Sequence, residues 1–299
     1  MEHDRQFDPH YGTAVEIADG IRRVTAHNPG PFTFHGTNSY LVGHSSVTVI
    51  DPGPADEGHI NTLLSAIGGA PVEAILVSHT HMDHSPGARL LKDRTGAPIV
   101  GCAPYRPARD LGFGESNPMD ASSDKSYHPD RHLKDNEVFA TSGVRFHAIE
   151  TPGHTDNHLC FSIEGTPFLF SADHVMAWST SIVAPPDGSM QSYMASLERL
   201  LARTESTYLP GHGGSVHNAH DYMSALKAHR LKREASILAR LGHDPITIPE
   251  LVLGVYDGLD PVLRPAAALS AFAHLEDLAA RGLVRADPAI RLDAGYSLA

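Results

Sequence analysis

The amino-acid sequence predicts a layered α/β domain followed by a smaller, mostly helical domain. In the first two thirds of the chain, short runs of apolar and β-branched residues alternate with turns and helical stretches, as in sheets covered by helices. Beyond Gly214 the pattern becomes helical and ends in a short hairpin. We therefore predict one domain at residues 1–214 and a second at residues 215–299.

The first domain alternates strands with a few helices. Its strands are expected at residues 39–42, 47–50, 74–78, 98–102, 144–150, 158–163, 168–171 and 207–209. Its helices are expected at residues 55–67, 86–94 and 190–202, the last with Ser189 as N-cap. Residues 101–135 are rich in Pro, Asp, Ser and His without periodicity, which indicates a long surface loop near the mouth of a site.

The second domain begins with a long charged linker helix at residues 217–241. Two shorter helices at 250–256 and 265–281 follow, and then a hairpin formed by 282–288 and 291–292. Three helices and a hairpin are the element order of a winged-helix module. The helix at 265–281 has arginines only at its ends, Arg264 and Arg281, so we expect it to pack against the protein rather than to bind DNA.

Composition narrows the class of protein. The chain has 299 residues and a net charge of -12, which disfavours tight binding to duplex nucleic acid. No apolar run is long enough to span a membrane, and the polar start of the chain lacks a signal sequence, so the cytoplasm is the expected compartment. The two cysteines, Cys102 and Cys160, lie in apolar runs and are expected to be buried thiols.

Potential metal ligands cluster directly after an apolar strand. His79, His81, Asp83 and His84 follow the strand at 74–78 within six residues. No regular strand could direct all four toward one point. A loop that turns into a helix could do so, and Ser85-Pro86 is a suitable helix start, with Ser85 as N-cap and Pro86 at the first helical position. Such a loop can supply ligands to two adjacent metal ions.

Three further candidates, His154, Asp173 and His212, each follow the end of another apolar run. In layered α/β folds the carboxyl ends of strands meet at one edge, so we expect these side chains to gather around one pocket. Imidazole and carboxylate ligands suit zinc, and also iron or manganese. Two such ions can hold a bridging hydroxide, the nucleophile of a hydrolase. Asp83 can also orient that hydroxide and accept its proton.

The order of these motifs resembles the metallo-β-lactamase fold superfamily. The motifs are His79-Thr80-His81-Met82-Asp83-His84, Thr151-Pro152-Gly153-His154-Thr155, Ser171-Ala172-Asp173 and Pro210-Gly211-His212. The resemblance covers roughly residues 15–214 and implies an αββα sandwich. It also implies that His79, His81 and His154 bind one metal ion, that Asp83, His84 and His212 bind a second, and that Asp173 bridges both. The C-terminal part resembles the lactamase-β-like branch, which carries a winged helix.

The sequence is compatible with three different functions. The first is a dinuclear hydrolase, with two zinc ions, that acts on a small acyl molecule such as a thioester or lactone; the acidic charge favours it. The second is an endoribonuclease acting on single-stranded RNA, which the ligand set and the tail of the resembling branch favour. The third is a non-catalytic winged-helix binding protein with a structural metal site. A homodimer is considered as the assembly, and no membrane partner is expected.

Several residues near the motifs have open roles. Phe32 and Phe34 either form an apolar lip for substrate or belong to ordinary packing. Asp51 is expected to accept hydrogen bonds from ligands rather than to bind metal itself. Trp178, the sole tryptophan, either lines the pocket or packs in the core. His174 is expected to point away from the metals.

Overall fold

The computed structural model describes residues 2–256 and 258–299, and it contains two large mixed sheets and one small sheet. The strands of the first sheet lie in chain order: β1 Val15–Ala18, β2 Ile21–Thr25, β3 Asn38–Val42, β4 Val47–Ile50, β5 Val72–Val77, β6 Ile99–Gly101 and β7 Arg131–His132. The second sheet has the order β13-β12-β11-β10-β9-β8, with β8 Val138–Thr141, β9 Val144–Glu150, β10 Leu159–Ile163, β11 Phe168–Ala172, β12 Thr207–Pro210 and β13 Val216–His217.

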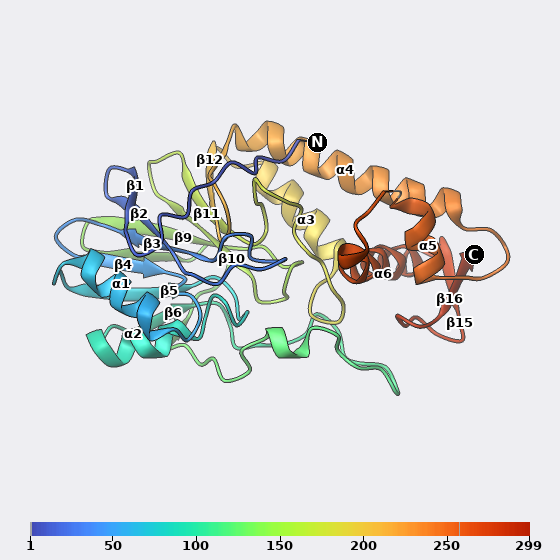
Figure 1. Ribbon diagram of the computed structural model, residues 1–299, viewed down its shortest axis with the longest axis horizontal. Helices are drawn as coiled ribbons and strands as arrows, with labels where there is room; N and C mark the ends of the chain where they lie inside the picture. The colour runs from blue at the N-terminus through green and yellow to red at the C-terminus, as the bar shows by residue number, and fades with distance from the viewer. Residues whose placement is uncertain (1, 257) are drawn as a thin grey trace.

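The two sheets pack face to face and carry helices on their outer faces (Figure 1). Helices α1 Glu57–Ile67 and α2 Gly87–Thr95 connect the parallel strands β4, β5 and β6 of the first sheet. In the second sheet, neighbouring residues point to opposite faces, so Phe161 and Phe170 pack toward the first sheet while Cys160 and Leu169 pack toward α3 Met190–Leu201. The four layers are helix, sheet, sheet and helix, as predicted.

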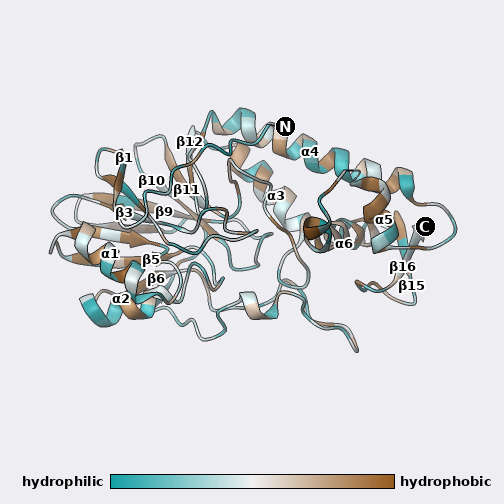
Figure 2. Cartoon of the chain, viewed as in Figure 1, coloured by the Kyte–Doolittle hydropathy of each residue, from teal (hydrophilic) through white to brown (hydrophobic). Residues whose placement is uncertain are grey.

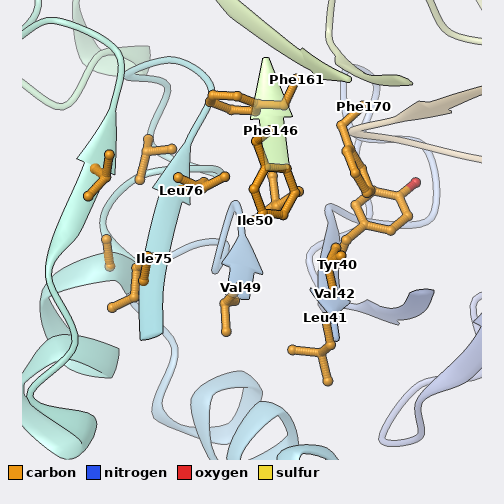
Figure 3. Packing of buried hydrophobic residues seen from close by; sticks show 14 of the residues in the cluster. Tyr40, Leu41, Val42, Val49, Ile50, Ile75, Leu76, Phe146, Phe161 and Phe170 are labelled. Carbon is orange, nitrogen blue, oxygen red and sulfur yellow. The ribbon is translucent and has the colours of Figure 1, made fainter. Parts of the chain in front are cut away.

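The core between the sheets is aromatic and β-branched. Figure 3 shows Phe146, Phe161 and Phe170 of the second sheet beside Tyr40 and Ile50 of the first. All five side chains are almost completely buried. This packing holds the two sheets rigidly against each other and so fixes the relative positions of the loops that follow their strands.

Helix ends agree with the sequence in one case and differ in another. The hydroxyl of Ser189 accepts a hydrogen bond from the N–H of Ser192, so the predicted cap of α3 is confirmed. The predicted cap of α2 is wrong. Its helix starts at Gly87, and the hydroxyl of Ser85 instead donates to Asp124 at 3.1 Å. Asp124 lies in the long loop, so the Ser85 hydroxyl, which donates to this carboxylate, is directed toward that loop and accepts no hydrogen bond from an N–H at the start of α2.

In its two large sheets the structure adds strands that the sequence pattern does not predict: β1, β2, β7, β8 and β13. In β2, Arg22 and Arg23 interrupt the apolar pattern. Arg23 is nevertheless buried, because its guanidinium donates to the carbonyl of Asp8 and lies 4.3 Å from the centre of the Phe7 ring. Apart from β7 and a short 3-10 helix at Asp120–Ser122, the long loop at 101–135 is irregular, as expected, except for β6 at its start. Both cysteines are buried thiols, as expected.

The C-terminal part consists of α4 Ala219–Arg240, α5 Ile248–Val255, the 3-10 helix η2 Pro261–Leu263, α6 Arg264–Ala280 and a small sheet with the order β14-β16-β15. Its strands are β14 Ile246–Thr247, β15 Val284–Asp287 and β16 Gly295–Leu298. The prediction of the second hairpin strand at 291–292 is wrong. The backbone N–H and carbonyl of Arg291 bond to the hydroxyl of Tyr296 instead of a neighbouring strand.

Helix α4 belongs to two hydrophobic cores. Met223 and Leu226, in its first half, pack with α3 and the second sheet, whereas Ile237 packs with α5 and α6. Figure 1 shows α4 running from the sandwich to the C-terminal part, and Figure 2 shows its mixed hydrophilic and hydrophobic residues. Across residues 2–256 and 258–299, no helix is long and apolar enough to cross a membrane.

Candidate metal centre

The seven predicted ligands come together at one edge of the sandwich. His79, His81, Asp83 and His84 lie in the loop after β5 of the first sheet. His154, Asp173 and His212 follow β9, β11 and β12 of the second sheet. Strands β9 and β11 are both antiparallel to β10, and β12 is parallel to β11, so all three end at the same edge. The expected convergence of strand ends is therefore present in the structure.

One cluster joins His79, His81, His154 and Asp173, whose donor atoms all lie within 4.8 Å of one another. The Nδ1 of His81 lies 3.1 Å from Nε2 of His79 and 2.9 Å from Nε2 of His154. The Oδ2 of Asp173 lies 3.5 Å from Nε2 of His154. Ligands about 2.1 Å from a tetrahedral zinc ion are about 3.4 Å apart, so these spacings fit one metal ion.

A second cluster joins Asp83, His84 and His212. The Nε2 atoms of the two histidines lie 3.4 Å apart, and Oδ2 of Asp83 lies 3.3 Å from His84 and 3.2 Å from His212. Asp173 also reaches this cluster, with Oδ1 3.4 Å from His84 and Oδ2 3.3 Å from His212. Asp173 is thus the carboxylate that both clusters share.

Hydrogen bonds on the far side of the rings fix which nitrogen faces the cluster. The Nδ1 atoms of His154 and His212 donate to the carbonyls of Ile182 at 2.7 Å and Gly36 at 3.1 Å, and Nδ1 of His84 donates to Asp51 at 3.0 Å. Because those acceptors have no proton to give, Nδ1 carries the hydrogen in each ring and Nε2 presents a lone pair to the cluster.

His79 is oriented by a longer chain of hydrogen bonds. The hydroxyl of Ser78 donates to Oδ2 of Asp51 at 2.6 Å and accepts from Nδ1 of His79 at 2.9 Å. The other oxygen of Asp51 accepts from the backbone N–H of Ser78. Asp51 therefore orients His79 and His84 from behind, as predicted from the sequence.

The charges of the cluster favour a cation at its centre. Burial alone would raise the pKa of Asp173 and Asp83, but His84 and His212 hold both well below their ordinary values, so both carboxylates are ionised. Burial lowers the pKa of His81 to about 3, which keeps its ring neutral. Although burial opposes a charge on His212, Asp173 and Asp83 raise its pKa to about 9. A positive charge is thus stabilised between the two carboxylates.

An unpartnered oxygen points to the same conclusion. Oδ1 of Asp173 is buried and makes no hydrogen bond. When the rings of His84 and His212 are neutral with the hydrogen on Nδ1, their Nε2 atoms present two lone pairs to each other 3.4 Å apart. Buried polar atoms without a partner are rare and costly. Divalent cations would satisfy these lone pairs, so the donor set fits metal binding.

A cavity of about 550 Å³ opens onto this cluster. Five of the candidate ligands, His81, Asp83, His154, Asp173 and His212, line it. Its other walls are mostly apolar, with Met82, Met119, Met176, Trp178 and Ile182 from the sandwich and Leu259, Leu263 and Ala267 from the C-terminal part. Among the described residues that line it, none is a lysine or an arginine.

The cavity shows which of the aromatic residues near the motifs line the site and which pack against other side chains. Phe32 lines it and is 48% exposed, whereas Phe34 stacks on Trp178 with ring centres 4.8 Å apart. Trp178 both packs and lines the cavity. His174 points away, as expected, and its buried ring lies 4.5 Å from that of Tyr193.

Sequence reasoning missed other residues that orient the candidate ligands. The hydroxyl of Thr37 donates to Oδ2 of Asp83 at 3.0 Å. Nε2 of His158 accepts from the backbone N–H of Asp173 at 3.3 Å, and its other nitrogen bonds Thr151. The carbonyls of Gly36 and Ile182 are backbone groups that any residue would supply, so no residue type could have revealed them.

Comparison with known proteins agrees with this geometry. Residues 32–212 match the family model of the metallo-β-lactamase superfamily. The chain belongs to this superfamily. Residues 247–291 match the β-lactamase-associated winged helix domain, so the predicted combination of a metallo-β-lactamase fold and a winged helix is confirmed.

Relatives of this metallo-β-lactamase superfamily member cover most of the chain. A β-lactamase-like protein 2 homolog from Caenorhabditis elegans is 28% identical over 92% of this chain and 89% of its own length. A protein from Claviceps purpurea named atrochrysone carboxyl ACP thioesterase is 25% identical over 87% of this chain and 79% of its own. The chain is a hydrolase of the superfamily, as predicted.

Solved structures share the whole architecture. A β-lactamase domain protein from Burkholderia ambifaria superposes with a TM-score of 0.78 at 21% identity, covering 99% of this chain and 96% of that one. A metallo-β-lactamase family protein from Thermus thermophilus gives 0.73 at 21% identity, covering 95% and 100%. At this identity the likeness concerns the fold, including the C-terminal part.

Proposed function

We propose that the protein is a dinuclear metal-dependent hydrolase of small acyl compounds, of the thioester or lactone type. The observation that carries the proposal is that the ligand cluster lies at a mostly apolar cavity whose described lining residues include no lysine or arginine. Such a cavity can bury an acyl group while its carbonyl reaches the metal ions. Curated relatives named as thioesterases add support.

In the proposed centre, His79, His81 and His154 hold one ion, Asp83, His84 and His212 hold the other, and Asp173 is shared. When bound, two zinc ions, or iron or manganese in their place, would supply Lewis acidity and would lower the pKa of a water molecule that acts as the nucleophile. The chain itself supplies the fixed positions of these ligands through Asp51, Ser78 and the backbone carbonyls behind the rings.

Asp83 is proposed to handle the proton of the attacking water. Its side chain is 24% exposed, compared with 8% for Asp173, so its carboxylate borders the cavity. The hydroxyl of Thr37 and the rings of His84 and His212 hold Oδ2 in place. A carboxylate held in this way can orient a water molecule and accept its proton.

Cleavage of single-stranded RNA is less well supported. Binding a phosphate backbone requires lysine and arginine side chains near the reacting centre. The described lining residues include neither, and the chain carries a net charge of -12. The third alternative, a non-catalytic winged-helix binding protein with a structural metal site, is also less well supported, because α6 and the segment before it form part of the wall of the cavity at the candidate ligands.

The test uses the purified full chain with its metal content measured before and after zinc loading. We expect hydrolysis of N-acetylcysteamine thioesters or of simple lactones, loss of activity with chelator, and recovery with zinc. Asp83→Ala should lower the rate at least a hundredfold, whereas Asp93→Ala, at an exposed position of α2, should not change it. Salt-sensitive RNA cleavage without any acyl hydrolysis would refute the proposal.

A further inference from the structure

One wall of the cavity comes from a single face of the C-terminal helix. Leu263, Ala266, Ala267 and Ser270 all line the cavity. Residues three and four apart lie on the same side of a helix, so these positions form one stripe along the start of α6. This face lies far beyond the last candidate ligand in the sequence, yet it borders the same space as Asp83, Asp173 and His212.

The other side of α6 is large and closely packed. Leu269, Phe272 and Leu275 are buried, and Phe272 and Leu275 pack with Ile248, Leu251 and Tyr296 in the C-terminal core. That packing fixes the helix in place. The side chains of Ala266, Ala267 and Ser270 are small and therefore leave space in the cavity beside the helix. Because α6 is fixed by its packing on the other side, it cannot move into this space.

The space between this face and the candidate ligands suits a flexible apolar chain. Met82, Met119 and Met176 line it, and unbranched thioether side chains adapt to ligands of different shape. A buried carboxylate oxygen without a hydrogen bond, Oδ1 of Asp173, lies at the ligand end of the same cavity. The cavity thus combines the polar candidate ligands with a mostly apolar remaining wall, to which α6 contributes Ala266 and Ala267.

We propose that the cavity-facing side of α6, at Ala266, Ala267 and Ser270, sets the length of the acyl chain that the enzyme accepts. This inference rests on the proposed hydrolysis of acyl compounds at the same site. The carbonyl lies at the metal ligands and the alkyl chain extends toward α6. Each added methylene that is buried strengthens binding about fourfold, and this gain stops when the chain reaches the helix.

Trp178 provides a direct readout of occupancy, because it is the sole tryptophan of the chain and it lines the cavity. The probes are straight-chain carboxylates from butanoate to decanoate, titrated into the zinc-loaded full chain while the fluorescence of Trp178 is recorded. We expect the affinity to rise roughly 250-fold over four methylenes and then to level off. An affinity that does not change with chain length would overturn the proposal.

Two variants shorten the cavity. Ala266 is only partly buried, so Ala266→Phe extends into the cavity without disturbing the core, and Ser270→Leu does the same one turn further along. Ala280→Phe is the matched control, because Ala280 is exposed on the same helix. Both cavity variants should weaken octanoate binding at least tenfold and leave butanoate within twofold, with unchanged zinc content and melting temperature. Equal losses for both acids would overturn the proposal.

Turnover of acetyl and octanoyl N-acetylcysteamine thioesters separates this inference from the proposed function. If the carboxylates bind with the expected length dependence but neither thioester nor lactone is hydrolysed, the proposed function fails and the role of α6 stands. If both thioesters are hydrolysed and Ala266→Phe lowers the two rates equally, the role of α6 fails and the proposed function stands.

Discussion

Gly211 lies against two of the candidate metal ligands, and adding one methyl group there should displace them. A Cβ atom at this position would lie 2.5 Å from Oδ1 of Asp173 and 2.6 Å from Cε1 of His84. An ordinary contact needs about 3.4 Å, so Gly211→Ala requires displacements of about 0.9 Å and 0.8 Å. Metal-binding constellations tolerate only about 0.5 Å.

The surrounding structure prevents an easy adjustment. The backbone N–H of Gly211 donates to the carbonyl of Ala172 at 2.9 Å, and its carbonyl accepts from the N–H of Asn38 at 2.7 Å. His84 is held from behind by Asp51 at 3.0 Å. The loop and the ligands therefore cannot move apart without losing hydrogen bonds. We expect Gly211→Ala to weaken metal binding about 10- to 100-fold, the range seen when ligand orientation is disturbed.

The assay compares the metal content of wild type and Gly211→Ala after dialysis against graded concentrations of chelator. Gly214→Ala is the control, because a Cβ atom there would lie 3.9 Å from its nearest neighbour, a ring atom of Phe7, which is an ordinary contact. Gly211→Ala should lose its metal at a chelator concentration at least about tenfold below the one that wild type requires. Gly214→Ala should behave as wild type. Equal metal retention in all three proteins would refute the steric reasoning.

Two further predictions concern Asp173 and His274. Asp173→Ala removes the carboxylate that both clusters share, so metal content should fall toward one ion per chain and activity at least tenfold; two retained ions at full rate would contradict the sharing. Burial lowers the pKa of His274 to about 3, so as the pH falls from about 6.5 toward 3 the unfolded chain takes up the proton first and stability is lost. As the pH is lowered from 7.5 to 5, the free energy of unfolding of His274→Leu relative to that of wild type should rise by about 2 kcal/mol. Urea unfolding of the two metal-free proteins measures this difference, and a difference that does not change with pH would count against burial as the cause.

The candidate ligands could be predicted because each follows a strand end that the sequence also marks. Apolar runs before His79, His154, Asp173 and His212 specify buried strands, and the loop after each strand has only a few residues in which to place its side chain. The position of a ligand relative to its strand is therefore local information. Convergence of four strand ends then follows from the layered architecture.

The surroundings of the centre depend on contacts that are distant in sequence. The carbonyl of Ile182 orients His154, and Thr37 orients Asp83, although nothing in either local sequence marks the contact. The predicted cap of α2 fails for the same reason, because the hydroxyl of Ser85 is directed toward Asp124, 39 residues away, to which it donates. The wall contributed by α6 likewise arises from the docking of the C-terminal part.

The candidate metal ligands and the part of the cavity wall formed by α6 are encoded in separate stretches of the chain. All seven candidate ligands lie at or before His212, whereas the helix that contributes Ala266, Ala267 and Ser270 to the cavity wall begins at Arg264. If α6 sets the accepted chain length as proposed, substitutions in that helix would alter which molecules fit and leave the metal ligands unchanged. Exchanging the last helices between members of the superfamily would then transfer substrate preference as a modular trait, and diversification of these enzymes could proceed without rebuilding their chemistry.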